Sequence, residues 1–126
     1  MGKRDVTWKK NAEESDYKAA NDFLNLLCTE ATAHKLIGSL RRSSTIERRA
    51  KDLLRASSLP LLPKDDPHVE DDLGKIHKGK PMAPVLLIRG SIAKGSPLVV
   101  ADGYHRICAI WHFDESAPIP CKMASA

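Results

Sequence analysis

Apolar residues in the first half of the chain recur at the spacing of an α-helix. Between Phe23 and Leu40 they return every three or four residues, with a break at Cys28 and Thr29. This period predicts amphipathic helices that each bury one face. The residues that keep this near-helical spacing are Phe23, Leu26, Leu27, Ala31, His34, Ile37 and Leu40.

A further helix is predicted from Ser44 onward. Ser44 and Glu47 have the spacing of a capping box, in which each end of the motif satisfies a free backbone N–H of the other. The helix is expected to end at residues 56–58. Its apolar face consists of Ile46, Ala50, Leu53 and Leu54.

The pattern changes at residue 59, where short apolar runs bounded by proline and glycine replace the helical period. Leu59–Pro63 is flanked by prolines, which suits an edge strand. Asp66 as N-cap and Pro67 at the first helical position predict a helix that Gly79 ends. The remaining expected elements are strands at 85–89, 98–101 and 119–123, with a helix that follows Gly103.

This order of elements predicts an α+β fold, a small mixed β-sheet with packed helices, preceded by a helical N-terminal extension. The expected division is an extension over residues 1–57 and a domain over residues 58–126. A chain of 126 residues with 42% hydrophobic and 29% charged residues is ordinary globular material.

Several features of the sequence predict a cytoplasmic protein with no membrane partner. The longest apolar run, Met82–Ile88, is far shorter than the roughly 20 residues that span a bilayer, and the N-terminus has no apolar signal segment. The three cysteines have no Cys-x-x-Cys spacing, which favours reduced thiols over disulfides or a zinc site.

The positive charge is concentrated in one region. Residues 35–55 carry seven lysines and arginines against two acidic residues, so this segment accounts for more than the net charge of +4 of the whole chain. Such a region suits a surface that binds nucleic acid or an acidic partner, and it is equally typical of a solvated helix face.

The most informative stretch is the predicted junction between the strand that ends near Asp102 and the helix that follows it. Gly103 lets a ligand approach the backbone closely, and the free N–H groups and dipole of the helix start favour an anion. His105 and Arg106 lie in the first turn of this helix. The combination predicts binding of a phosphate group.

Residues 59–124 resemble the ParB N-terminal/sulfiredoxin-like superfamily. The shared features are a lead helix at 67–78, a strand that follows Pro84, a Gly-x-His/Arg-Arg turn before a helix, and a terminal strand at 119–123. Here the turn reads Asp102, Gly103, Tyr104, His105 and Arg106.

The resemblance implies that this turn binds nucleotide phosphates, with ATP or CTP and Mg²⁺ as the expected cofactors. Tyr104 occupies the position of the sulfiredoxin cysteine, so the chain lacks the nucleophile for sulfinic acid reduction. The helix-turn-helix that partition proteins carry beyond this fold is not in the sequence, which argues against a CTP-gated DNA clamp.

Candidate site residues come from the turn and from the lead helix. The expected catalytic residues are His105, Glu70 and Asp66. The expected ligand-binding residues are Asp102, Gly103, Tyr104, His105, Arg106, Lys64 and His68. No metal site made by the protein alone is expected.

Each candidate also has a structural alternative. Arg106 has the spacing to pair with Asp102, His105 can hold the turn by a hydrogen bond, and Asp66 suits an N-cap. Asp71 and Asp72 fit a solvated face.

The leading functional hypothesis is a nucleotide- or phosphate-binding protein with Mg²⁺-dependent hydrolysis or phosphoryl transfer as the candidate reaction. The alternative is a nucleic-acid-binding module or nuclease that uses the basic region Lys35–Arg55. The sequence does not specify the nucleotide, the acceptor, the oligomeric state or whether the protein is catalytic.

Overall fold

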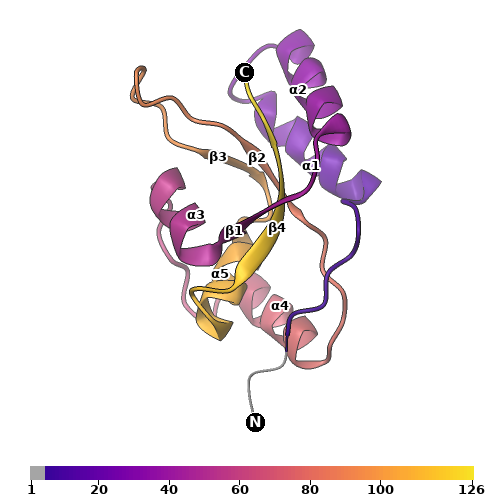
Figure 1. Ribbon diagram of the computed structural model, residues 1–126, viewed down its shortest axis with the longest axis vertical. Helices are drawn as coiled ribbons and strands as arrows, with labels where there is room; N and C mark the ends of the chain where they lie inside the picture. Colours follow the sequence, from indigo (N-terminus) through magenta and orange to yellow (C-terminus); the bar gives the residue numbers. More distant parts are fainter. Residues whose placement is uncertain (1–4) are drawn as a thin grey trace.

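The computed structural model describes residues 5–126 as an α+β fold, which confirms the predicted fold class (Figure 1). The helices are α1 (Glu14–Leu24), α2 (Glu30–Arg42), α3 (Ala50–Ser57), α4 (Pro67–His77) and α5 (Tyr104–Phe113). The strands are β1 (Ile46–Arg49), β2 (Val85–Ile88), β3 (Val99–Asp102) and β4 (Pro118–Ala124).

The four strands form one mixed sheet in the order β1-β4-β2-β3. Strand β4 runs antiparallel to β1 and parallel to β2, and β2 runs antiparallel to β3. Cys121 of β4 lies between Ile46 of β1 and Val85 of β2 in this register. The small mixed sheet expected from the sequence is therefore present.

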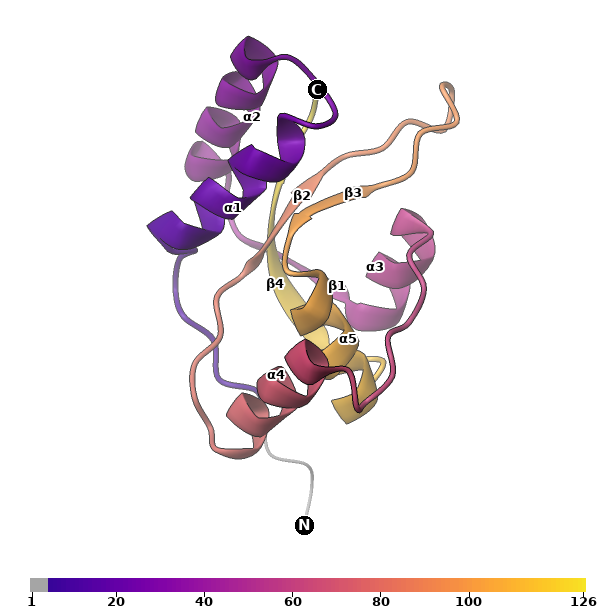
Figure 2. The same cartoon turned by 180° about the vertical axis from the view of Figure 1, so that it is seen from behind.

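Helices cover both faces of the sheet, as Figures 1 and 2 show. Because successive side chains of a strand point to opposite faces, Leu86 and Ile88 pack with α1 and α2, whereas Val85 and Leu87 pack with α3, α4 and α5. The result is a three-layer arrangement with two separate cores. The second core contains most of the buried residues of the C-terminal half of the chain.

The prediction that a helix begins at Ser44 is wrong for the first turn, because residues 46–49 form strand β1. Ile46 is drawn into the sheet by its pairing with Cys121, and the Ser44–Glu47 capping box does not form. The helix begins only at Ala50, and it buries positions 50, 53, 54 and 57 on one face. Pairing with β4 therefore outweighs the local capping signal.

Residues 59–63 form no strand, so the predicted edge strand is also wrong. Its two prolines lack the N–H groups that a ladder needs. Side chains of α5 hold the segment instead. The Tyr104 hydroxyl donates to the carbonyl of Pro60 over 2.5 Å, and Nε2 of His112 lies 2.7 Å from the carbonyl oxygen of Leu62.

Most other element boundaries follow the sequence signals. Thr29 caps α2 at the expected break, and Asp66 caps α4 with Pro67 at its first position. The expected boundary between the N-terminal extension and the domain, between residues 57 and 58, lies at the end of α3. Strand β1 and helix α3, which lie before it, nevertheless belong to the same sheet and the same core as the elements after it. Within residues 5–126, no helix has both the length and the apolar character needed to cross a membrane.

Candidate functional site

Helix α5 begins directly after β3 at a left-handed glycine. Gly103 is the N-cap of α5, with φ of +112° and no side chain to cap the helix. A Cβ atom there would lie 2.5 Å from Val85 Cγ1 and 2.8 Å from Nη2 of Arg106. Only glycine fits this position, because both the backbone angle and the space exclude a side chain. The first N–H groups of α5 are thereby left without an intrahelical or side-chain partner.

A polar cavity of about 230 Å³ lies beside this helix start, between α4 and α5. It contains the predicted turn together with one face of α4. Its lining residues are His68, Asp71, Asp72, Lys75, Asp102, Gly103, Tyr104, His105 and Arg106.

The α4 side of the cavity was only partly foreseen from the sequence. The sequence predicts His68 as a ligand-binding residue, but it assigns Asp71 and Asp72 to a solvated face and does not indicate Lys75. The positions 68, 71, 72 and 75 have the spacing of one helix face. This polar stripe opposite the apolar positions of α4 is the signal that would have identified them.

Arg106 is held in a network of ion pairs and hydrogen bonds. Its Nη2 lies 3.2 Å from Oδ2 of Asp102 and 3.3 Å from the carbonyl oxygen of Pro84, and Nη1 lies 3.8 Å from Oδ1 of Asp16. The ion pair with Asp102 is the structural alternative that the sequence raised. The third partner, Asp16, comes from α1 and carried no sequence signal. Nε of Arg106 is buried and makes no hydrogen bond within the described residues.

Burial perturbs two carboxyl groups of the cavity. Desolvation raises the pKa of Asp102 to about 6, against the opposing charge of Arg106. Desolvation also raises the pKa of Asp72, although Lys75 acts in the other direction. Protonation of these groups is therefore easier than at an exposed carboxylate, and perturbed carboxyl groups in a cavity are typical of functional sites.

His105 and Tyr104 follow Gly103 at the start of α5. The His105 ring lies 4.6 Å from the ring of His68 and 5.7 Å from that of Tyr104, measured between centroids. The Tyr104 side chain is half-buried, and its hydroxyl donates to the carbonyl oxygen of Pro60. The structure thus brings His68, His105 and the turn together.

Three predicted residues do not line the cavity. Oδ1 of Asp66 accepts hydrogen bonds from the backbone N–H groups of His68 and Val69, which is its structural role as N-cap. Glu70 is exposed and lines a different depression on α4. Lys64 is exposed ahead of α4.

The cysteines are not suited to nucleophilic chemistry. All three are free, and Cys108 and Cys121 are buried. Burial raises the pKa of Cys108 and raises that of Cys121 to about 12, so very little thiolate exists at neutral pH. Across residues 5–126, no three His, Cys, Asp or Glu side chains are grouped to hold a metal ion.

Comparison with known family models, with curated proteins and with solved structures found no match for this chain.

Proposed function

We propose that this protein binds a phosphate-bearing ligand, a nucleoside triphosphate such as ATP or CTP, at the start of α5. The observation that supports the proposal is the uncapped helix start at Gly103, which opens into a cavity lined by both basic and acidic side chains. Free N–H groups and the helix dipole favour an anion there, and His68, His105 and Lys75 surround the same space.

Two further properties of the cavity fit this ligand. The buried Nε of Arg106 is a donor without an acceptor, and a guanidinium matches phosphate oxygens well. Asp71, Asp72 and Asp102 also line the cavity, and their charge would repel a bare phosphate. Mg²⁺ carried by a nucleotide removes this conflict, because it binds carboxylate and phosphate oxygens together.

The candidate reaction is hydrolysis or transfer of a phosphoryl group. Bound Mg²⁺ would supply charge neutralisation at the phosphates. Within the chain, the helix start and Arg106 would orient the phosphate, and His105 would carry a proton. The resemblance to ParB-like proteins supports this assignment, and the three free cysteines support a cytoplasmic location.

The test is a calorimetric titration of the protein with inorganic phosphate, ATP and CTP, each with and without Mg²⁺. Arg106→Ala should weaken nucleotide binding about ten- to hundredfold, as expected for loss of charge-assisted hydrogen bonds worth about 1.5–3 kcal/mol. Lys75→Gln, at an exposed position of α4, should weaken binding without affecting the fold. Release of phosphate from bound nucleotide, and its loss in His105→Ala, would identify the reaction.

Lys78→Gln is the matched control, because Lys78 follows Lys75 by one helical turn and does not line the cavity. It should bind nucleotide like the parent protein. Unchanged affinity in both Lys75→Gln and a folded Arg106→Ala variant would exclude this site.

The nucleic-acid alternative has less support from the geometry. The basic residues of 35–55 are distributed over α2, β1 and α3 instead of lying along one helix. Arg41 pairs with Glu14, and Arg55 pairs with Asp52, so two of these charges are already neutralised. We therefore place the phosphate-binding function first.

A further inference from the structure

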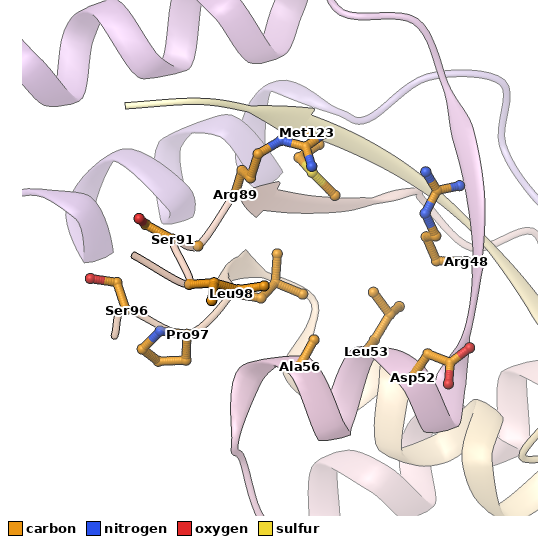
Figure 3. Close-up of a pocket in the computed structure, with 12 residues that line it drawn as sticks. Arg48, Asp52, Leu53, Ala56, Arg89, Ser91, Ser96, Pro97, Leu98 and Met123 are labelled. Carbon is orange, nitrogen blue, oxygen red and sulfur yellow. The ribbon is translucent and has the colours of Figure 1, made fainter. Parts of the chain in front are cut away.

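A second cavity lies on the same face of the sheet and shares no residue with the first. It is an open groove of about 590 Å³ between α3 and the hairpin that joins β2 to β3 (Figure 3). This volume is within the range of small-molecule sites.

The floor of the groove is aliphatic. Leu53 of α3 belongs to the core beneath it, and Leu98 and Met123 are partly buried against that core. Ala56 completes the α3 side. Among the described residues that line the groove none is aromatic, so no side chain is present on which a nucleobase could stack. The floor therefore suits a flexible hydrocarbon chain.

Two arginines stand opposite α3. Arg48 comes from β1 and Arg89 follows β2, and Figure 3 shows both on the strand side of the groove, across from Leu53 and Ala56. Neither guanidinium forms an ion pair with a carboxylate anywhere in residues 5–126. Nη1 of Arg48 donates to the carbonyl oxygen of Glu47 over 2.7 Å.

Asp52, the acidic residue among those that line the groove, does not neutralise the two arginines. Asp52 pairs with Arg55, with 3.5 Å between the nitrogen and the oxygen. The groove thus combines an aliphatic floor with two positive charges that lack carboxylate partners, and this combination is complementary to an anion with an apolar tail.

The wall of the groove is held in place before any ligand binds. Ser91 and Ser96 exchange backbone hydrogen bonds of 2.8 and 2.9 Å across the hairpin. The N–H of Leu98 donates to the carbonyl of Ala56 over 3.0 Å, which ties the hairpin to the end of α3. A preformed wall lowers the entropic cost of binding.

We propose that this groove binds an aliphatic carboxylate, namely a medium-chain fatty acid. The hydrocarbon chain lies on Leu53, Leu98 and Met123, and the carboxylate faces Arg48 and Arg89. This inference is independent of the phosphate-binding function, because the two sites share no residue.

The experiment is a titration of the intact protein with decanoate, 1-decanol and acetate, in which the NMR signals of the methyl groups report binding. Decanoate should shift the methyl signals of Met123 and Leu98 and leave those of Val69, a buried residue of α4, unchanged. 1-Decanol, which has the same chain without the charge, should bind at least tenfold more weakly. Acetate, which has the charge without the chain, should not bind measurably.

Variants separate the two parts of the site. The double variant Arg48→Gln, Arg89→Gln should weaken decanoate binding at least tenfold. It should leave the affinity for 1-decanol unchanged, because the alcohol carries no charge. Both side chains are exposed, so the substitutions should not disturb the fold. Arg49→Gln, an exposed arginine of β1 outside the groove, is the matched control and should bind decanoate normally. Ala56→Glu should abolish decanoate binding by placing a carboxylate on the floor.

Three results would overturn the proposal. They are decanoate titrations that leave the Met123 and Leu98 signals in place, equal affinity for decanoate and 1-decanol, and full decanoate affinity in the double arginine variant.

Discussion

At the scale of single residues, the pair formed by Asp102 and Arg106 determines how the cavity responds to pH. The Arg106 guanidinium is shared between Asp102 and Asp16, and the side chains of all three residues are at most 18% exposed. Their charges are thus only partly screened by water. A phosphate that binds Arg106 must compete with these carboxylates, and protonation of Asp102 removes one competitor.

The raised pKa of Asp102 predicts a pH-dependent stability. An aspartate with a pKa of about 6 in the folded state and about 3.9 in the unfolded state binds its proton more tightly when folded. Its contribution to the free energy of unfolding is therefore greatest below about pH 4 and is lost as the pH rises through 6, by up to about 3 kcal/mol.

Urea unfolding between pH 4 and pH 7 measures this contribution. The free energy of unfolding of the parent protein, relative to that of Asp102→Asn, should fall as the pH rises across that range, because only the parent loses the proton of Asp102. Asp71→Asn, at an exposed position of the same cavity, should track the parent. A constant difference between the parent and Asp102→Asn would contradict the assignment.

At the scale of elements, α4 shows where local signals suffice. Asp66, Pro67 and Gly79 are short-range stop and start signals, and the helix follows them. Strand β1 shows where they fail. The capping signal of Ser44 and Glu47 lies beside Ile46 in sequence, but the residue with which Ile46 pairs, Cys121, lies in the last strand. Long-range pairing of this kind leaves no local trace, so the register of β1 could not be predicted from the sequence.

The cap of α4 gives a prediction that also separates two roles of Asp66. Asp66→Ala should lower the free energy of unfolding by about 0.5–2 kcal/mol, the usual cost of losing an N-cap. Asp66→Asn should retain most of the stability, because an asparagine side chain also caps helices. Asp65→Ala, one residue earlier and exposed, is the control. A loss of nucleotide turnover in a stable Asp66→Asn variant would restore the catalytic role that the sequence indicated.

At the scale of the whole molecule, the candidate site is assembled from both helix layers. The turn before α5 and the His68 position were predictable, because strand, glycine and helix follow each other in sequence. Asp16 was not, since it reaches Arg106 only because α1 packs against β3 at the end of the sheet. Ligand contacts at Arg106 therefore connect the packing of α1 to that of α5.

The distribution of charge over the molecule predicts weak binding to duplex DNA. With its basic residues spread over three elements, the protein should not bind duplex at physiological salt in fluorescence anisotropy titrations. Four aligned phosphate contacts would instead give a slope of about −3.6 in log affinity against log salt. Such a slope, flattened by Arg42→Glu and Arg49→Glu while ATP binding persists, would favour the nucleic-acid alternative.

The position of β4 has a consequence for how the chain is made. Strand β4 is paired with β1 on one side and β2 on the other, although it follows both in sequence (Figure 1). A chain emerging from the ribosome can form its helices and the β2–β3 hairpin early. Strand β1 has no neighbour to pair with until residues 118–121 have emerged. Of the described strands, the last to be synthesised is the one that joins the two parts of the sheet.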